Sequence, residues 1–387
     1  MEMDFRKAVL PVMCLLMMVA CKKTGGNGGA NGGNGTGGTG TVNQDTVGTL
    51  KSAANSGFPF GLAIEYGLFK QNQAYAAVVK REASVVTFGY QMKHGAIVKD
   101  DGSFDFSSAD ELLALCNNAG LEVYGHTLVW HQNQNGNYLR SLTVGNTQQV
   151  AIAIDSAMSR FIRASMMRYA GKVKAWDVVN EPMMDGNSGL RTNTGTTTGD
   201  AFYWSQYLGR GYALKAFQYA KAADPNALLF INEYNLEYNP AKLDSLISYV
   251  NELKAQGAKI DGIGTQMHIS INTPLSGIDN AFKKLAATGL KVRVSELDVR
   301  VNPNDVTGFV AGKTALEAQA SMYKYVLNAY IQNVPQPQRY GFMVWGIADS
   351  DSWIITSQKK TDAPLLFDNS YGKKPAFYSL LSGFKGK

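Results

Sequence analysis

The chain has 387 residues, of which 45% are hydrophobic, and its formal net charge is +6 at pH 7. This apolar content is ample for one large core, so one large folded domain is expected rather than two. The charge is mild for this length and no block of lysine or arginine is present, which excludes the usual electrostatic features of a nucleic-acid-binding protein.

Residues 1–20 have the pattern of a secretory signal. Arg6 and Lys7 precede an apolar run that is too short to cross a bilayer. The small residues before Cys21 resemble the lipobox of bacterial lipoproteins, although Met18 stands where that pattern usually has leucine. The resemblance implies that Cys21 is acylated and that the protein is secreted and lipid-anchored to a bacterial membrane, at the outer membrane or the cell surface. Ordinary cleavage that leaves a free thiol is the alternative.

Residues 21–45 are rich in Gly, Asn and Thr, which cannot bury apolar surface, so a flexible tether is expected there. The expected folded domain covers residues 46–387. Cys116 is the cysteine that remains in this domain, and it falls in a helical apolar pattern. It is therefore expected to be a core residue without a disulfide partner.

Beyond the tether, short apolar runs alternate with longer amphipathic ones, which is typical of repeated βα units and a parallel sheet. Eight such strands would close a (β/α)8 TIM barrel. Asn118, Gly171, Gly257 and Gly289 stand at or just beyond helix ends, where C-caps occur. The expected strands cover residues 60–63, 85–88, 122–130, 173–180, 228–233, 262–268, 292–296 and 341–345, and the clearest helical patterns cover residues 109–119, 148–170, 205–223, 241–255, 277–287 and 315–331.

Two of the expected strands stop at a glutamate. In residues 176–182 (Trp-Asp-Val-Val-Asn-Glu-Pro), the valines favour a strand and Pro182 forces the chain out of the sheet just after Glu181. Residues 290–298 repeat the pattern with Glu296. The carboxyl ends of parallel barrel strands meet at one mouth, where catalytic groups collect. Paired carboxylates there are what glycoside hydrolysis needs, although a helix cap or a surface position is the simpler alternative for a single glutamate.

Three segments resemble glycoside hydrolase family 10, the retaining endo-β-1,4-xylanases. They are residues 125–131 (Gly-His-Thr-Leu-Val-Trp-His), 177–182 (Asp-Val-Val-Asn-Glu-Pro) and 295–298 (Ser-Glu-Leu-Asp). The resemblance covers residues 58–384, and it implies an endo-xylanase that hydrolyses internal bonds of xylan through a glycosyl-enzyme intermediate. A monomer is expected, although no sequence feature determines the oligomeric state. Glu181 would be the acid/base and Glu296 the nucleophile.

Four further residues would support this pair by the same resemblance. Asn180 would hydrogen-bond the 2-hydroxyl group of the sugar under attack. Gln266 would orient the acid/base or a sugar hydroxyl group. His268 would hydrogen-bond Glu296, and Asp298, on the same face of its strand as Glu296, would hold the imidazole ring in place.

The resemblance also assigns residues to substrate binding. His126 would contact sugar hydroxyl groups beside the scissile bond, and Trp130 would form a wall of that subsite, with core packing as the alternative. Asn133 stands at the position of a sugar-binding glutamine. Trp345 and Trp353 would form the floor and roof of the glycone subsites, because flat aromatic faces suit pyranose rings.

The chain departs from the family pattern after its second strand. Where the family has Glu-Asn-x-Met-Lys, residues 89–93 read Gly-Tyr-Gln-Met-Lys, so that Lys93 alone keeps a sugar-binding side chain. Tyr90 is bulkier than asparagine and would either block the second glycone subsite or stack on a decorated sugar. The alternatives are therefore a decorated xylan or another β-glycan as substrate, or, from a different class, an inactive tethered glycan-binding lipoprotein.

Other polar residues are expected to have smaller roles. His126 and His131 lie in one segment, but the carboxylate ligands and the spacing of a zinc hydrolase are missing, so no metal site is expected. Asn232 and Asn235 are expected to be structural or to lie on the aglycone side. No sequence feature demands a cofactor.

Overall fold

The computed structural model describes residues 48–54, 58–192 and 199–386. The predicted signal, the tether and Cys21 lie outside these residues. Among the residues described, no helix is both long enough and apolar enough to span a membrane. Cys116 is a free, buried thiol in a helix, as its sequence pattern predicts.

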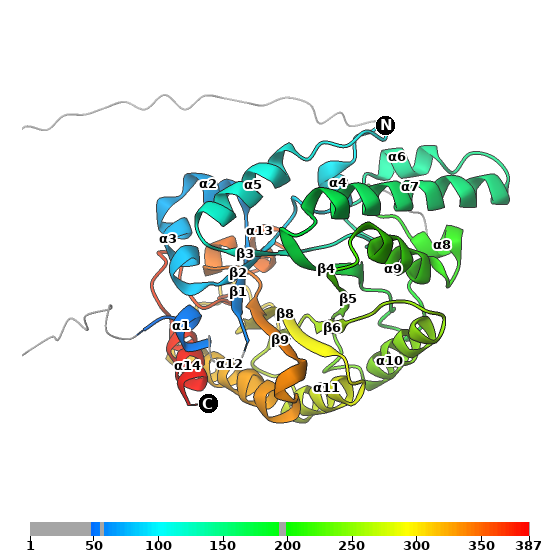
Figure 1. Ribbon diagram of the computed structural model, residues 1–387. Helices are drawn as coiled ribbons and strands as arrows, with labels where there is room; N and C mark the ends of the chain where they lie inside the picture. Colours follow the sequence, from blue (N-terminus) through cyan, green and yellow to red (C-terminus); the bar gives the residue numbers. More distant parts are fainter. Residues whose placement is uncertain (1–47, 55–57, 193–198, 387) are drawn as a thin grey trace, which may run out of the picture. The chain divides into compact units, whose positions relative to one another are not determined.

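Eight parallel strands of the described domain close a barrel, which confirms the predicted (β/α)8 fold (Figure 1). From β1 to β6 each strand pairs with the next along the chain, and the ring closes through β6–β8, β8–β9 and β9–β1 pairs. Strand β7 is a short piece that pairs with the far half of β8. The strands are β1 (Phe60–Ile64), β2 (Val85–Phe88), β3 (Glu122–Gly125), β4 (Val173–Asn180), β5 (Leu228–Glu233), β6 (Gly262–Thr265), β7 (His268–Ser270), β8 (Lys291–Arg300) and β9 (Arg339–Val344).

The barrel strands are buried on both faces, because helices cover the outside and side chains fill the inside. All positions of β1 are buried, and so is every position of β4 except Lys174. Such strands read as short continuous apolar runs rather than as alternating patterns, which is why their places were predictable.

Three strands differ from the sequence prediction by three or more residues at their carboxyl ends. Strand β3 ends at Gly125, before the predicted end at residue 130. Met267 has a positive φ of 61°, and this turn separates β6 from β7 within the predicted strand at residues 262–268. Strand β8 does not stop at Glu296 but continues to Arg300, because β7 pairs with its second half.

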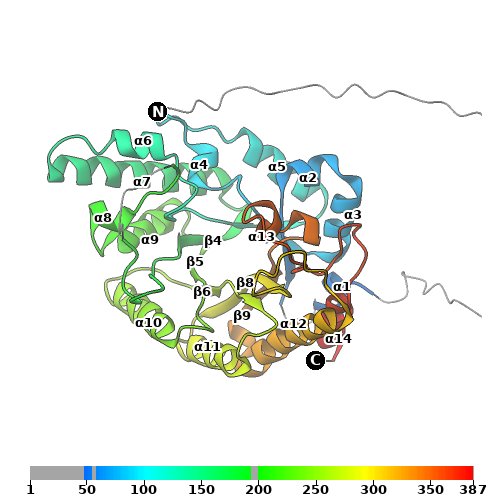
Figure 2. The ribbon, with the colours of Figure 1, turned by 180° about the vertical axis from the view of Figure 1, so that it is seen from behind.

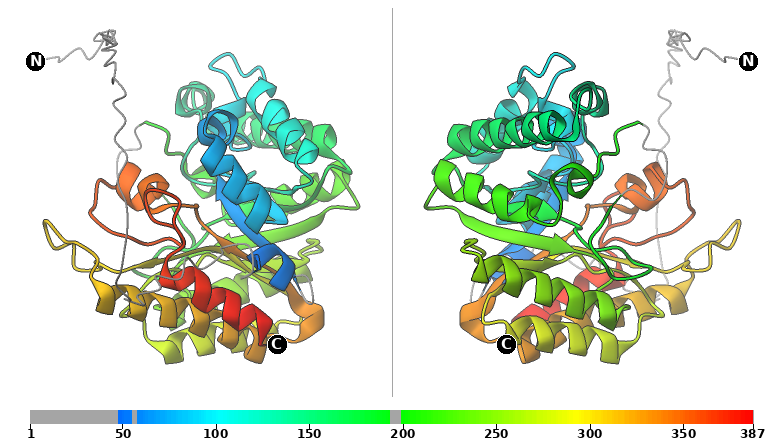
Figure 3. Two further views of the ribbon diagram at one scale, coloured as in Figure 1. Left: turned by 90° about the vertical axis from the view of Figure 1, so that its left-hand side faces the viewer. Right: turned by 90° about the vertical axis from the view of Figure 1, so that its right-hand side faces the viewer.

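Helices surround the ring of strands on all sides (Figure 2), and α12 and α14 lie side by side on its outer surface (Figure 3). The predicted helix at residues 205–223 is two helices, because Gly209 has a φ of 64° and ends the first of them. The helices are α1 (Leu50–Ala54), α2 (Tyr66–Gln71), α3 (Gln73–Glu82), α4 (His94–Ile97), α5 (Ser107–Asn118), α6 (Gly136–Ser141), α7 (Thr147–Tyr169), α8 (Trp204–Leu208), α9 (Tyr212–Ala223), α10 (Pro240–Ala255), α11 (Leu275–Ala287), α12 (Lys313–Asn333), α13 (Trp353–Thr356) and α14 (Pro375–Lys385), with short 3-10 turns η2 (Gln336–Gln338) and η3 (Asp349–Asp351).

Three of the predicted C-caps are confirmed. Gly171, Gly257 and Gly289 follow α7, α10 and α11 with φ values of 73°, 92° and 73°. Asn118 is the last residue of α5, and the left-handed residue after that helix is Gly120, with a φ of 68°. Glycine takes this conformation without a steric cost, so it reverses the chain at the helix end.

The barrel interior is a packed core. Tyr124, Phe230 and Tyr340 come from β3, β5 and β9, which do not neighbour one another, and their rings meet with centroids 4.8 to 6.4 Å apart. The guanidinium carbon of Arg293 lies 3.4 Å from the centroid of the Tyr124 ring. These side chains occupy the barrel interior, and in parallel barrels functional side chains collect at the carboxyl ends of the strands.

Candidate active site

Glu181 directly follows the last residue of β4, as predicted from Pro182. Its backbone is left-handed, with a φ of 53°, which is strained for a residue that has a side chain. Two hydrogen bonds hold this turn. The Glu181 amide donates to the carbonyl oxygen of Asn232 at 2.8 Å, and Arg191 Nε donates to the carbonyl oxygen of Glu181 at 2.8 Å. The position of the Glu181 side chain is therefore defined by its backbone.

Two side-chain amides bind one oxygen of the Glu181 carboxyl group. Gln266 Nε2 donates to Oε1 at 3.0 Å, and Asn180 Nδ2 donates to the same oxygen at 3.1 Å. The other oxygen, Oε2, lies 3.8 Å from His131 Nδ1. Oε2 is consequently the oxygen that is available to carry or release a proton.

His131 is a site residue to which the sequence assigned no role. Its ring stacks on Tyr203 with the centroids 5.7 Å apart. Burial lowers the pKa of His131 to about 3, and the positive charges of Arg191 and Lys242 act in the same direction. Above that pH the ring is neutral, so it borders Glu181 without adding a cation. The sequence contains one indication that His131 belongs to the site, because it lies in the same short segment as His126.

Glu296 lies in the middle of β8 and is 5% exposed. Asn232 Nδ2 donates to Glu296 Oε1 at 2.7 Å and also to Asn180 Oδ1 at 2.8 Å. Since Asn180 in turn donates to Glu181, a chain of two amides connects the two carboxyl groups. The structure therefore brings the two predicted glutamates into one hydrogen-bond network.

Asn232 contacts Glu296 directly, whereas the sequence predicted a structural role or a position on the aglycone side. Its Oδ1 accepts a hydrogen bond from Ser295 Oγ at 2.7 Å, which fixes the orientation of the amide. Gly264 on the neighbouring strand makes room for it, since a Cβ atom there would lie 2.2 Å from Asn232 Oδ1. Asn235 instead contacts Asp185, at 3.4 Å.

A second chain of contacts supports the other oxygen of Glu296. His268 Nε2 lies 3.4 Å from Glu296 Oε2, and His268 Nδ1 lies 2.8 Å from Asp298 Oδ2. The same Asp298 oxygen accepts a hydrogen bond from Trp353 Nε1 at 2.8 Å. The indole ring of Trp353 is thus held by the residue that also orients the imidazole ring of His268.

The charges of this group favour an ionised Glu296. Burial would raise the pKa of Glu296, but the hydrogen bond from His268 and the positive charges of His126, His268 and Lys93 overcome it and lower the pKa to about 2. Burial likewise opposes the charged form of His268, but Asp298 and Glu296 raise its pKa to about 10. Between these limits the pair consists of a carboxylate and an imidazolium.

The remaining predicted binding residues line the same mouth. His126 Nδ1 lies 2.9 Å from Asp177 Oδ2, which leaves its Nε2 for a ligand. The ring of His126 contacts Trp345 at a centroid distance of 5.3 Å. The ammonium group of Lys93 lies 4.7 Å from the ring centroid of Trp130 and 6.0 Å from that of Trp345. Trp130, Trp345 and Lys93 therefore form one wall.

Asn133 and Tyr90 lie at the edge of this arrangement. Asn133 Oδ1 accepts a hydrogen bond from Lys93 Nζ at 3.2 Å, and its Nδ2 donates to Asp200 at 3.0 Å, so protein groups engage both ends of the amide. Tyr90 is 41% exposed. Within the described ranges, no group of three or more His, Cys, Asp and Glu residues is arranged to hold a metal ion.

Comparisons with known proteins agree with this geometry. Residues 49–382 match the model of the family described as glycosyl hydrolase family 10. An endo-β-1,4-xylanase of Cellvibrio japonicus is 35% identical over 347 residues, which cover 84% of this chain and 56% of that relative. The chain thus spans just over half the length of this curated relative.

Solved structures show the same fold. Xylanase B from Clostridium stercorarium F9 matches with a TM-score of 0.77 at 30% identity, covering 86% of this chain and 99% of that one. A variant of xylanase 10C from Cellvibrio japonicus, in complex with xylopentaose, matches with a TM-score of 0.78 at 32% identity, covering 88% of this chain and 70% of that one.

Proposed function

The chain belongs to glycosyl hydrolase family 10, and on this premise we propose that it is a retaining endo-β-1,4-xylanase. The observation that carries the proposal is the network in which Asn180 and Asn232 connect Glu181 with Glu296. Glu296 is a carboxylate with a low pKa, and Glu181 has one oxygen, Oε2, to which neither Asn180 nor Gln266 donates. Retaining hydrolysis needs such a pair of a nucleophile and an acid/base. Xylan is the proposed substrate because the similar proteins are named as xylanases.

The proposed reaction has two steps. In the first, Glu296 attacks the anomeric carbon while Glu181 Oε2 gives a proton to the leaving oxygen, and a glycosyl ester forms on Glu296. In the second, Glu181 removes a proton from water, which attacks the same carbon and releases the sugar with its original anomeric configuration. Asn180 would bind the 2-hydroxyl group, and Gln266 would keep Glu181 in place between the steps.

Replacing His268 with glutamine is expected to move the acid limb of kcat/KM to higher pH by about one unit or more. His268 lowers the pKa of Glu296 through a hydrogen bond and through its charge, whereas burial raises it. Without His268 the nucleophile would take up a proton at higher pH, so activity would be lost earlier as the pH falls. The measurement is kcat/KM of both proteins from about pH 3 to pH 8.

The control for this experiment is glutamine in place of Glu122, at an exposed position on β3. A profile of the His268 variant that keeps the wild-type acid limb and differs only in height would contradict the assigned role of His268.

A decorated xylan or another β-glycan is the second candidate substrate. It is favoured by the exposed ring of Tyr90 in the segment where the family has a smaller sugar-binding residue. The test is product analysis on unbranched xylan, arabinoxylan, glucuronoxylan and a β-glucan. Short xylo-oligosaccharides from unbranched xylan are the expected result. Release from one of the other polymers alone would favour the second candidate, and no release from any of them would favour a binding protein.

We further propose that the protein is a monomer held at a bacterial membrane through a lipid on Cys21. The signal pattern of residues 1–20 and the small residues before Cys21 support this. Full-length protein made in a lipoprotein-processing bacterium should enter the detergent phase of a phase-separating detergent, whereas Cys21→Ala should stay in the aqueous phase. Equal partitioning of the two proteins would contradict the anchor, and a light-scattering mass of two chains would contradict the monomer.

A further inference from the structure

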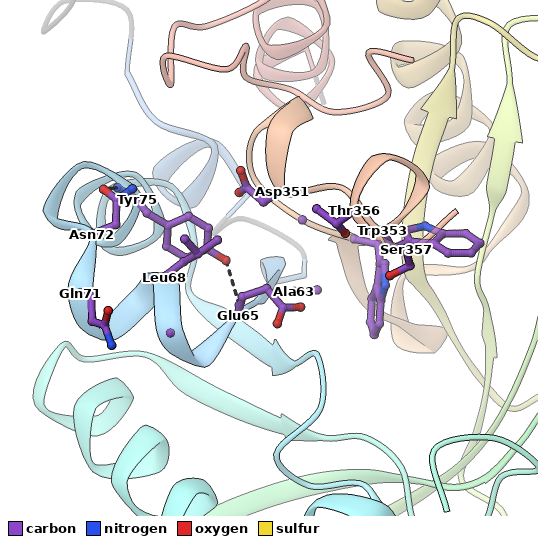
Figure 4. A pocket seen from close by; sticks show the side chains of 13 residues that line it. Ala63, Glu65, Leu68, Gln71, Asn72, Tyr75, Asp351, Trp353, Thr356 and Ser357 are labelled. Atoms are coloured by element: carbon purple, nitrogen blue, oxygen red, sulfur yellow. Dashed lines mark hydrogen bonds between the residues drawn. The ribbon is translucent and has the colours of Figure 1, made fainter. Parts of the chain in front are cut away.

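Two spaces at the carboxyl end of the barrel differ greatly in size. A cavity of about 640 Å³ opens beside Trp345 and Trp353 and belongs to the predicted glycone side of the mouth (Figure 4). A second space, which Glu181 and Arg191 help to line, measures only about 10 Å³ and holds at most about one water molecule. Protein groups rather than bulk solvent therefore support Glu181 on the side of this second space.

The backbone turn at Glu181 depends on support from other parts of the chain. Its φ of 53° lies in the left-handed region, which residues with a side chain keep only where the surrounding structure fixes it. Pro182 follows directly and has no backbone N–H group with which to hold the turn. The carbonyl groups of residues 181–183 are therefore the groups through which this turn can be fixed.

Arg191 donates hydrogen bonds to the carbonyl oxygens of all three of these residues. Its Nε donates to the carbonyl oxygen of Glu181 at 2.8 Å. Its backbone amide donates to that of Pro182 at 2.6 Å, and its Nη2 donates to that of Met183 at 2.6 Å. One residue thus binds three consecutive carbonyl groups, beginning at the predicted acid/base.

A short hairpin in the loop after β4 brings Arg191 back to the turn. Met183 and Leu190 form an antiparallel bridge within this hairpin. On the other side of the loop, Ser205 Oγ in α8 donates a hydrogen bond to the carbonyl oxygen of Arg191. Because the backbone of Arg191 is held from both sides, its guanidinium group has a defined position.

A network of polar side chains connects the guanidinium group of Arg191 to the neighbouring strand β5. Nη2 also donates to the hydroxyl oxygen of Tyr234 at 2.9 Å, and this hydroxyl group donates to Asp185 Oδ2 at 2.7 Å. The buried ammonium group of Lys242 donates to Asp185 Oδ1 at 2.8 Å and lies 3.0 Å from Glu233, the last residue of β5. The guanidinium group is therefore fixed against the barrel itself.

The contacts of this guanidinium group depend on its shape more than on its charge. Its three acceptors are neutral: the carbonyl oxygens of Glu181 and Met183 and the hydroxyl oxygen of Tyr234. Arginine presents donors on several nitrogens in one plane, whereas all the donors of a lysine side chain lie on one nitrogen. Arg191→Lys would therefore keep the charge but lose part of the support of the turn.

We propose that Arg191 is a positioning residue for the acid/base. By holding the carbonyl oxygens of residues 181–183, it fixes the backbone turn from which the Glu181 carboxyl group reaches the leaving oxygen. It acts through that backbone, whereas Asn180 and Gln266 hold the carboxyl group itself. This inference rests on the proposed xylanase function and adds a residue of the loop after β4 to those on which the proton transfer depends.

Two substrates distinguish a displaced acid from a generally damaged enzyme. An unbranched xylo-oligosaccharide needs a proton on its leaving sugar, whereas an aryl xylobioside with an acidic nitrophenol does not, and kcat/KM reports the first step for both. Arg191→Ala and Arg191→Lys should lower kcat/KM on the oligosaccharide by about 10- to 100-fold, because a displacement of about 1 Å has an effect of that size. On the aryl substrate kcat/KM should stay close to the wild-type value.

Tyr234→Phe provides a second route to the same displacement, because it removes one hydrogen bond of the guanidinium group but keeps the ring. A smaller loss, again confined to the oligosaccharide, is expected. Arg168→Ala is the matched control. Arg168 donates to Asp110 at 2.8 Å and lies 4.8 Å from the ring centroid of Phe106, but it belongs to the last turn of α7, just before β4 begins. Its kcat/KM should stay within about two-fold of the wild-type value on both substrates.

The outcomes distinguish the role of Arg191 from the proposed function, with folding of each variant checked by thermal unfolding. Equal losses on the two substrates in the folded Arg191 variants, or wild-type activity of Arg191→Lys on the oligosaccharide, would overturn the positioning role while xylanase activity of the wild type remained. If Arg191→Ala did not fold, Arg191→Lys and Tyr234→Phe would decide by the same comparison. Failure of the wild type to cleave the oligosaccharide would overturn the proposed function and the positioning role together.

Discussion

Glu296→Ala is expected to lower kcat on unbranched xylan by a factor on the order of 10⁵, because loss of a nucleophile removes the covalent route altogether. Glu296 is the buried carboxylate to which Asn232 donates and next to which His268 lies. No other carboxylate shares those contacts in the described chain. The measurement is the rate of release of reducing sugar, with folding checked by thermal unfolding.

Added azide gives this prediction a second readout. In the alanine variant a small anion can enter the space of the missing carboxylate and attack the anomeric carbon from the same side. The expected product is a glycosyl azide of inverted configuration, formed by the variant and not by the wild type. Alanine at the exposed Glu122 is the control and should leave kcat within about two-fold, as for surface substitutions in general. Residual xylanase activity of the Glu296 variant above one-hundredth of the wild-type rate would contradict the nucleophile assignment.

Glu181→Ala is expected to slow the hydrolysis of substrates whose leaving group needs a proton more than that of substrates whose leaving group does not. Proton donation by a positioned acid contributes about 10²–10⁴-fold, so hydrolysis of xylan should slow by that factor. An aryl xylobioside with an acidic nitrophenol needs no proton, so its first step should remain fast. The glycosyl-enzyme should then accumulate, because Glu181 is also needed to activate water.

Burst kinetics test this second prediction. The variant should release one equivalent of nitrophenol rapidly and then turn over slowly. Gln266→Ala is the matched comparison, because it removes one hydrogen bond to Glu181 Oε1 but keeps the carboxyl group. Equal loss on xylan and on the aryl substrate, without a burst, would contradict the acid/base assignment.

The barrel and the position of Glu181 at a strand end were predictable from local sequence. Pro182 has no backbone N–H group to donate to a neighbouring strand, so it predicts the end of β4 regardless of tertiary structure. Buried parallel strands are short apolar runs, which can be recognised in the sequence. The break at Gly209 and the continuation of β8 past Glu296 were not predictable in the same way. The first depends on where one glycine takes a left-handed conformation, and the second on pairing with β7, a contact that local sequence does not contain.

Several site contacts also arise only from tertiary structure. Asn232 reaches Glu296 because Gly264 on the next strand leaves space for its amide. His131 lies beside Glu181 because two strand ends meet at the barrel mouth. The same holds for Arg191, which reaches the carbonyl oxygen of Glu181 from the loop after β4. The residue types were visible in the sequence, but the distances between them were not.

The central claim is retaining hydrolysis by Glu181 and Glu296, and the stereochemistry of the first product tests it most directly. Proton NMR during the first minutes of hydrolysis of a xylo-oligosaccharide distinguishes the two anomers before mutarotation mixes them. The account predicts that the β-anomer appears first and the α-anomer only later. Initial formation of the α-anomer would contradict it, because a single displacement by water would then replace the glycosyl-enzyme intermediate on Glu296.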